Sequence, residues 1–276
     1  MADYHPPWLQ TLPHQQRPAF RAYRQFNSLR DQLYFGPDKH GSTAQSICSV
    51  KSRLNHEKLT YFSTNRMPDK VARILGEAQA LDTKEVIESF EFFQRVRHRI
   101  SRSVVVDLCC GHGLVGMLFA LLERKVEHVF LLDVEFPKSS YMIESLLNNV
   151  WPWVSPKLHR VQRSVKGAHT DLPQGAGIVA VHACGARTDW SIDVARQLKG
   201  PLAVMPCCYA HQVYQGPETL KRHLGVTLCV DIQRTMQLET AHYSVDWQEI
   251  PPEITPKNRI ISASPTHVTI SHSRDV

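Results

Sequence analysis

One stretch of the sequence constrains the fold more than any other. The apolar run Val104–Leu108 carries an acid near its end, turns through Gly111 and Gly113, and enters a second apolar run, Leu114–Leu122. Strand, glycine turn and helix in this order are typical of a parallel βαβ unit, in which ligands bind beyond the carboxyl ends of the strands. Asp133 ends the next apolar run, twenty positions after Gly113. The pattern predicts an α/β sheet that binds a nucleoside.

The glycines have separate expected roles. Gly111 and Gly113 allow the backbone to turn sharply and to approach a ligand where a Cβ atom would collide, and Gly116 allows the helix to lie close to the sheet. With an acid about 20 residues further on, Gly111-x-Gly113-x-x-Gly116 also fits a dinucleotide site. A nicotinamide or flavin enzyme, or a fold without a cofactor, is therefore an alternative.

Asp107 favours a different cofactor. A carboxylate at the end of the strand would repel a pyrophosphate across a low-dielectric gap, whereas it attracts the ammonium and sulfonium groups of S-adenosylmethionine. We therefore expect S-adenosylmethionine, with its ribose diol on Asp133. The methionine end is expected at Asp107, Gly111 and Gly113, and Cys109 is a further candidate for contact with the cofactor. The alternative for Asp107 alone is a cap on the turn that follows.

Composition limits the class of protein. The 276 residues suffice for one sizeable core,. No apolar run approaches the length of a membrane-spanning helix, and Met1–Trp8 lacks the order of a secretory signal,. Seven cysteines, with two adjacent pairs, do not resemble a disulfide framework, so we expect a reducing, cytoplasmic location, with the nucleus as an alternative,.

A formal net charge of +6 favours a polyanionic partner such as RNA,. Basic residues gather in three places, and each could instead be a solvated face. The three clusters are Arg17–Arg30, Lys51–Lys58 and Arg95–Arg102.

The chain is expected to divide into an N-terminal arm with helices, residues 1–66, and a main domain, residues 67–276. The arm should include a helical piece near Pro18–Leu33. Pro68 in a first turn and an N-cap at Thr83 predict the starts of two further helices. Alternating apolar runs and helical stretches then predict parallel βαβ units. The expected strands are Val104–Leu108, Val129–Asp133, Leu158–Gln162, Ile178–Ala183 and Leu202–Pro206; the expected helices are Leu114–Leu122, Ser139–Asn149, Asp189–Leu198, Pro217–Leu224 and Val230–Glu239.

Two further strand-like runs, Tyr243–Trp247 and Ile260–Ala263, are separated by prolines. As antiparallel strands they would complete a seven-stranded, Rossmann-like sheet with an N-terminal helical extension.

Two strand ends carry the candidate chemistry. The fourth expected strand runs into His182-Ala-Cys184-Gly and then Thr188-Asp189, and the fifth runs into Pro206-Cys207-Cys208-Tyr209-Ala-His211. The candidate catalytic residues are His182, Cys184, Asp189, Cys207, Cys208 and Tyr209, and His182 is also a candidate for the cofactor.

These motifs resemble a methyltransferase-domain family. That family includes the domain of glutathione S-transferase C-terminal domain-containing proteins, the methyltransferase-like 25 group and, more distantly, the tRNA 2′-O-methyltransferase of the acceptor stem. The likeness covers roughly Pro68–Ala263, including the tail Ile254–Arg259. It implies a class I methyltransferase fold, S-adenosylmethionine as methyl donor and an RNA substrate. Tyr209 stands where the tRNA enzymes have a histidine, and their zinc modules are not recognisable in this sequence.

The cysteines and histidines leave alternatives open. Cys184 with Cys207 or Cys208 could add to a pyrimidine, as thiols do in RNA cytosine-5 methyltransferases, or could simply pack as small apolar residues. His182 or His211 could be a general base. Asp189 could cap its helix or orient a substrate, and Tyr209 could stack on a nucleobase.

We expect no metal. A zinc site would draw on His182, Cys184, Cys207, Cys208 and His211. However, the usual spacing of paired ligands is missing, and adjacent cysteines rarely reach one ion.

The sequence thus predicts an S-adenosylmethionine-dependent methyltransferase with RNA, in particular tRNA, as the leading acceptor. A small-molecule or protein acceptor is an alternative. So is an inactive module that binds a nucleoside or a partner. The sequence predicts no membrane association and leaves the oligomeric state open.

Overall fold

The computed structural model describes residues 53–209, 214–252 and 254–266. Two compact units share these residues. The smaller unit comprises the chain up to Glu91 together with Ile250–Pro256, and the sheet unit comprises Phe92–Glu249 together with the chain from Lys257 on. The expected domain boundary at residue 66 stays a prediction. The expected helix at Pro18–Leu33, the basic cluster at Arg17–Arg30 and His211 lie outside the described residues.

The sheet unit contains seven strands in the order β3-β2-β1-β4-β5-β7-β6. Strands β1 to β5 are parallel, whereas β7 is antiparallel to both β5 and β6. The expected seven-stranded methyltransferase sheet is therefore confirmed. The strands are β1 (Val104–Leu108), β2 (His128–Asp133), β3 (Leu158–Gln162), β4 (Gly177–Val181), β5 (Leu202–Met205), β6 (Tyr243–Glu249) and β7 (Arg259–Pro265).

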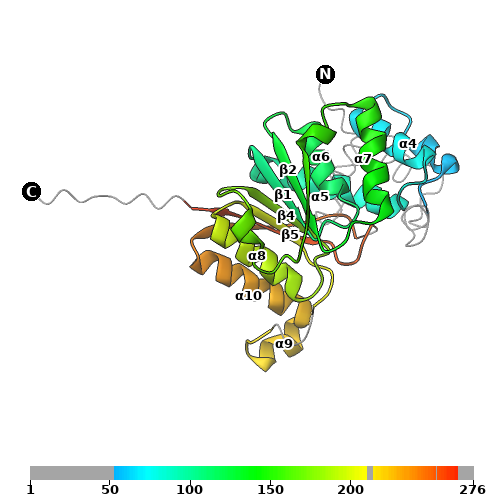
Figure 1. The fold of residues 1–276 in the computed structure, drawn as a ribbon. Coiled ribbons are helices and arrows are strands. Elements are labelled where there is room, and N and C mark those ends of the chain that lie inside the picture. Colours follow the sequence, from blue (N-terminus) through cyan, green and yellow to red (C-terminus); the bar gives the residue numbers. More distant parts are fainter. Residues whose placement is uncertain (1–52, 210–213, 253, 267–276) are drawn as a thin grey trace, which may run out of the picture. The chain divides into compact units, whose positions relative to one another are not determined.

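Helices cover both faces of this sheet. In Figure 1, α6 and α7 lie on one side of the labelled strands, and α8 and α10 lie on the other. The helices and 3₁₀ turns of the sheet unit are α6 (Leu114–Leu122), α7 (Lys138–Val150), η4 (Ser155–Lys157), η5 (Ala168–Asp171), α8 (Ala186–Leu198), α9 (Glu218–Leu224) and α10 (Val226–Thr240). Each expected helix in this part of the chain is present.

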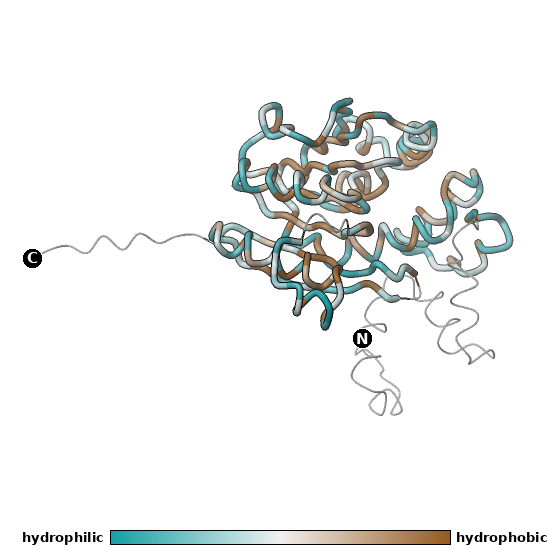
Figure 2. Tube along the Cα trace, turned by 90° about the horizontal axis from the view of Figure 1, so that it is seen from below, coloured by the Kyte–Doolittle hydropathy of each residue, from teal (hydrophilic) through white to brown (hydrophobic). Residues whose placement is uncertain are grey.

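The core of the sheet unit follows from sequence patterns. Four of the five β1 residues are buried, as a strand covered on both faces requires,. Helix α6 is buried along nearly its whole length, from Leu114 to Leu121. Figure 2 shows hydrophobic and hydrophilic stretches alternating along the chain, with many of the outer turns hydrophilic. Each fully buried aliphatic side chain contributes about 1.5–3 kcal/mol.

The smaller unit contains η3 (His56–Tyr61), α4 (Met67–Glu77) and the beginning of α5 (Thr83–Ile100). Pro68 lies in the first turn of α4, as expected. The N-cap prediction at Thr83 was wrong by one position, because Thr83 is already helical. The backbone N–H of Asp82 donates to the carboxylate of Glu85, which is the reciprocal bond of a capping box with Asp82 at the N-cap.

Among the described residues, no helix is both long and apolar enough to cross a membrane.

Candidate active site

The turn after β1 is open to a ligand at one glycine. Gly111 has φ +53°, and a Cβ atom added to it would meet nothing within 4 Å. Gly113 has φ +76° and faces Leu131. Cys109 adopts φ +54°, an uncommon conformation for a residue with a side chain,. The backbone at Gly111 therefore borders free space at the carboxyl end of β1.

Asp107 is buried in β1 and points at the following helix. It is 2 % exposed, and its Oδ2 accepts from the Gly116 N–H at 2.8 Å. Burial raises the pKa of Asp107 to about 7, against the lowering effect of the Gly116 bond; the nearby Asp133 charge raises it slightly further. The bond to Gly116 realises the capping alternative. A cation that approaches this carboxyl favours its ionised form and lowers its pKa.

Asp133 connects the turns after β1 and β2. Its Oδ2 accepts from the Gly111 N–H at 2.8 Å, and its Oδ1 accepts from the Val134 N–H at 2.7 Å. The carboxylate is only half-buried, so further lone pairs can accept from ribose hydroxyls. Asp133 is thus bonded directly to the glycine turn after β1, and its expected role at the ribose stays a prediction.

Burial raises the pKa of Cys109 to about 12 and raises the pKa of Cys110 as well. Both side chains therefore stay neutral thiols near pH 7, which suits packing beside the turn rather than nucleophilic chemistry.

The ends of β4 and β5 bring three cysteines together. The Sγ atoms of Cys184 and Cys207 lie 2.8 Å apart, and those of Cys207 and Cys208 lie 3.5 Å apart. Burial raises the pKa of Cys184 and of Cys207. Cys208 is exposed, and hydrogen bonds from the other two thiols lower its pKa. A raised pKa disfavours the thiolate form of Cys184, and the thiol-addition hypothesis stays a prediction.

His182 lies at the start of this cluster. Its backbone adopts φ +57°, and its N–H donates to the Met205 carbonyl at 3.0 Å. The bond connects the ends of β4 and β5. The expected roles of the imidazole at the cofactor or the acceptor stay predictions.

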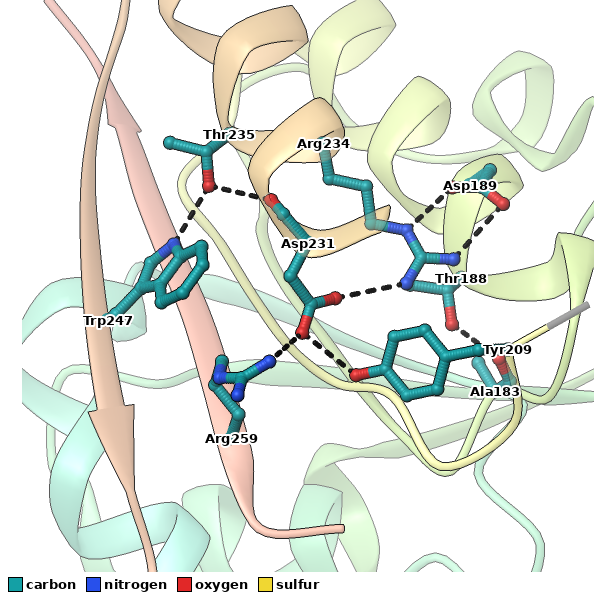
Figure 3. A network of polar contacts seen from close by, with 9 residues as sticks. All are labelled: Ala183, Thr188, Asp189, Tyr209, Asp231, Arg234, Thr235, Trp247 and Arg259. Atoms are coloured by element: carbon teal, nitrogen blue, oxygen red, sulfur yellow. Dashed lines mark hydrogen bonds and ion pairs between the residues drawn. The ribbon is translucent and has the colours of Figure 1, made fainter. Parts of the chain in front are cut away.

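A buried ion-pair network supports the β5 end (Figure 3). Asp231 of α10 is fully buried and accepts from the Tyr209 hydroxyl at 2.9 Å. It also accepts from Arg259 at 2.6 Å and from Arg234 at 3.3 Å. Arg234, which is 1 % exposed, also donates to both oxygens of Asp189, at 2.8 and 3.2 Å.

The network corrects one prediction about Asp189. Helix α8 begins after Gly185, which has no side-chain capping bond, and Asp189 lies inside its first turn. The capping interpretation was therefore wrong, because the carboxylate is held by Arg234, 45 positions away. A substrate-orienting role for Asp189 would have to share that carboxylate with Arg234.

Tyr209 is similarly engaged. Its hydroxyl is bonded to Asp231, and the cationic groups of Arg234 and Lys257 lie 5.6 and 5.8 Å from the centre of its ring. Burial, with the Asp231 charge, raises the pKa of Tyr209. Stacking of a nucleobase on this ring stays a prediction, and it would compete with those cations.

Sequence reasoning missed Asp231 and Arg234. Their spacing of three positions on one helix was a weak signal of an ion pair, whereas their partners are distant in sequence. Arg259 lies in the tail that the family resemblance had included.

The basic cluster at the end of α5 is used within the fold. Arg95 and Arg99 donate to the carbonyls of Glu249 and Ser262, at 2.7 and 2.9 Å. Arg97 pairs with Glu123 at 3.3 Å. Arg102 donates to the carbonyl of Ser101. These guanidinium groups therefore have structural contacts, whatever else they bind.

Comparison with known families decides the class of enzyme. Residues 82–215 match a family model described as a methyltransferase domain. Residues 82–215 are a methyltransferase domain. The sheet order agrees with this assignment, and S-adenosylmethionine is the methyl donor of the enzyme. No curated protein sequence is significantly similar to the chain.

Solved structures similar to the methyltransferase include enzymes with different acceptors. One is a SAM-dependent methyltransferase of Aquifex aeolicus, with 13% identity over 71% of this chain and 97% of that chain and a TM-score of 0.42. A second is the M1A22 tRNA methyltransferase TrmK of B. subtilis, with 11% identity over 63% of this chain and 65% of that chain and a TM-score of 0.42. A third is the ribosomal protein L11 methylase of Lactobacillus delbrueckii subsp. bulgaricus, with 11% identity over 67% of this chain and 80% of that chain and a TM-score of 0.39. These likenesses are too distant to assign an acceptor to this chain.

The residues beyond β1 and β2 fit the donor. The open space at Gly111 admits a ligand against the backbone, the Asp133 carboxylate is bonded to that glycine, and the buried Asp107 carboxyl lies in the preceding strand. Two acids suit a ligand with an ammonium, a sulfonium and a ribose diol.

Proposed function

We propose that the methyltransferase acts on RNA. The observation that supports this most is the placement of two cations beside the thiol-bearing strand ends. Arg187 and Lys257 are both exposed. The backbone N–H of Arg187 is bonded to the Cys184 carbonyl, and the Lys257 Nζ lies 5.8 Å from the ring centre of Tyr209, the neighbour of Cys208. In this proposal they flank the carboxyl ends of β4 and β5, where the acceptor would meet the methyl donor. Cations at this position favour an acceptor that carries phosphates, and the net charge of +6 agrees with this,.

The donor edge has a defined part in this proposal. When bound, S-adenosylmethionine supplies an electrophilic methyl carbon. Asp107 and Gly111 would hold the methionine end, and Asp133 the ribose, so that the methyl group faces the ends of β4 and β5. Orientation would supply much of the rate enhancement, because methyl transfer requires the nucleophile, carbon and sulfur in line.

We also propose the finer family grouping. His182-Ala-Cys184-Gly and Pro206-Cys-Cys-Tyr209 resemble the motifs of the methyltransferase-like 25 group and of the glutathione S-transferase C-terminal domain-containing proteins. Tyr209 in place of histidine separates this chain from the tRNA 2′-O-methyltransferase, so we propose RNA rather than one named nucleotide.

Charge neutralisation tests the acceptor class. In the double variant Arg187→Gln/Lys257→Gln, we expect weaker RNA binding that depends less on salt. The slope of the logarithm of the binding constant against the logarithm of the salt concentration should become shallower by about 1–2. The matched control is Arg124→Gln/Lys125→Gln. These two exposed cations precede β2 and so lie at the amino ends of the parallel strands, opposite the carboxyl ends where the ligand is expected. Titration of labelled RNA at several salt concentrations measures both quantities.

Methyl transfer identifies the acceptor directly. Labelled S-adenosylmethionine should transfer its methyl group to RNA from cells that lack the protein, and nucleoside mass spectrometry should show one modification missing from those cells. Transfer only to protein or to small molecules would overturn the RNA proposal and leave the enzyme class intact.

A further inference from the structure

Three thiols from two strand ends form one cluster. The Sγ atoms of Cys184, Cys207 and Cys208 all lie within 4.8 Å of one another. They are the one group of three or more His, Cys, Asp or Glu in the described ranges that could hold a metal ion. The objection that adjacent cysteines do not reach one ion fails here, because the Sγ atoms of Cys207 and Cys208 are 3.5 Å apart.

One of the sulfur–sulfur separations is close to that of two ligands on a shared cation. With zinc–sulfur bonds of about 2.3 Å, tetrahedral geometry separates two sulfur ligands by about 3.8 Å. The Cys207–Cys208 separation is close to this value. The Cys184–Cys207 separation of 2.8 Å is shorter than the roughly 3.5–4.0 Å of ordinary non-bonded contact,.

Rigid elements hold the cluster. The backbones of β4 and β5 pair up to Val181 and Met205, and the His182 N–H extends that pairing by one bond. The Thr188 hydroxyl donates to the Ala183 carbonyl at 2.5 Å, beside Cys184. Tyr209, next to Cys208, is fixed on Asp231. With the backbone held in this way, only the cysteine side chains have to move for an ion to bind.

The surrounding charges suit three thiolates. Three thiolates around a divalent ion leave one net negative charge. Two cations are close by to offset that charge: Arg187, whose backbone N–H is bonded to the Cys184 carbonyl, and Lys257, whose Nζ lies 5.8 Å from the ring centre of Tyr209, the neighbour of Cys208. All three ligands are sulfur atoms, and soft sulfur ligands select zinc over magnesium or calcium,.

We propose that Cys184, Cys207 and Cys208 bind one zinc ion as thiolates. Each thiol releases its proton to solvent on binding, and the Cys184 and Cys207 sulfurs move apart by about 1 Å to reach the tetrahedral spacing. Three protein ligands leave the fourth coordination position to water or to an oxygen or nitrogen of the acceptor. Zinc sites of this composition are reactive, whereas structural sites have four protein ligands.

Metal content tests the proposal. The full-length protein, purified with a phosphine reductant and without chelator, should contain about one zinc per chain by mass spectrometry of the elements. Cys184→Ser, Cys207→Ser and Cys208→Ser should each lose most of it. Cys229→Ser is the matched control, because Cys229 is a free, buried thiol of α10 outside the cluster, and it should retain the ion.

A second measurement uses only the wild-type protein, in case a variant fails to fold. Zinc should protect Cys184, Cys207 and Cys208 from alkylation, peptide by peptide, and a chelator should restore their reactivity. Cobalt(II) in place of zinc should give a sulfur-to-metal charge-transfer band.

The proposal would be overturned by wild-type protein that binds no zinc at micromolar concentrations, or by equal zinc content in all variants. Binding of copper(I) alone, or a Cys184–Cys207 disulfide that persists in the reduced protein, would equally contradict it. Because zinc content is measured without any acceptor, these outcomes are independent of the RNA proposal.

Discussion

Asp107 gives the protein a pH dependence at the scale of one residue. Burial raises its pKa from 3.8 to about 7, so the folded protein holds this proton more tightly than the unfolded chain. The resulting stabilisation is complete below pH 3.8 and is lost as pH rises through 7. A free carboxylate in this position is costly until a cation offsets it, which is a role that fits the methyl donor.

We expect Asp107→Asn to remove this dependence. Between pH 4 and 7, the free energy of unfolding of the ligand-free wild type should fall relative to the variant, by at most about 1.4 kcal/mol per pH unit. Denaturant unfolding at pH 5, 6 and 7 measures the difference. Asp193→Asn is the control, since that side chain is 62% exposed. Parallel pH profiles for wild type and Asp107→Asn would contradict the assignment.

At the scale of the element, the β1–α6 turn separates binding from packing. A Cβ atom at Gly116 would lie 2.6 Å from Leu131 Cδ2 and 3.1 Å from both Asp107 Cβ and Val129 Cγ1. A Cβ atom at Gly111 would meet nothing, although φ there is +53°. One glycine therefore serves the contact between helix and sheet, and the other serves the space for a ligand.

Two alanine variants should show opposite effects. Gly116→Ala should lower the free energy of unfolding by about 1–3 kcal/mol through overpacking, with little change in donor affinity of the folded protein. Gly111→Ala should cost about 1 kcal/mol of backbone strain and weaken donor binding at least about tenfold, because its methyl group occupies ligand space. Thermal unfolding of both variants measures the loss of stability, and calorimetric titration measures their affinity for the donor. Unchanged donor affinity in Gly111→Ala would place the ligand elsewhere.

At the scale of the whole molecule, the Arg234 network connects α8, α10, β7 and the end of β5 (Figure 3). Removing one partner of a buried pair leaves an uncompensated charge. Arg234→Met should therefore lower the free energy of unfolding by about 3 kcal/mol, with Arg259 still on Asp231,. Arg196→Met breaks an exposed pair with Asp193 and should cost less than about 1 kcal/mol. Equal losses in denaturant unfolding would show that the network contributes no more than a surface ion pair.

The sequence by itself determined most of the elements. Val104–Leu108, Leu114–Leu122 and Leu158–Gln162 have the bounds expected from their apolar patterns. Strand propensity, glycine turns and helix periodicity are local properties, and they act over a few residues. For the same reason the sequence indicated an acid-bordered glycine turn and the methyltransferase fold.

Only the tertiary structure decided which side chains meet. Cys184 and Cys207 are 23 positions apart, and Asp189 and Arg234 are 45 positions apart. Their contacts depend on which strands pair and on how α10 packs, and no local pattern encodes these. Thus an acid expected to cap a helix became the partner of a buried arginine, and cysteines that lack zinc-ligand spacing came together. Strand order and packing fix distances that the order of residues along the chain leaves free.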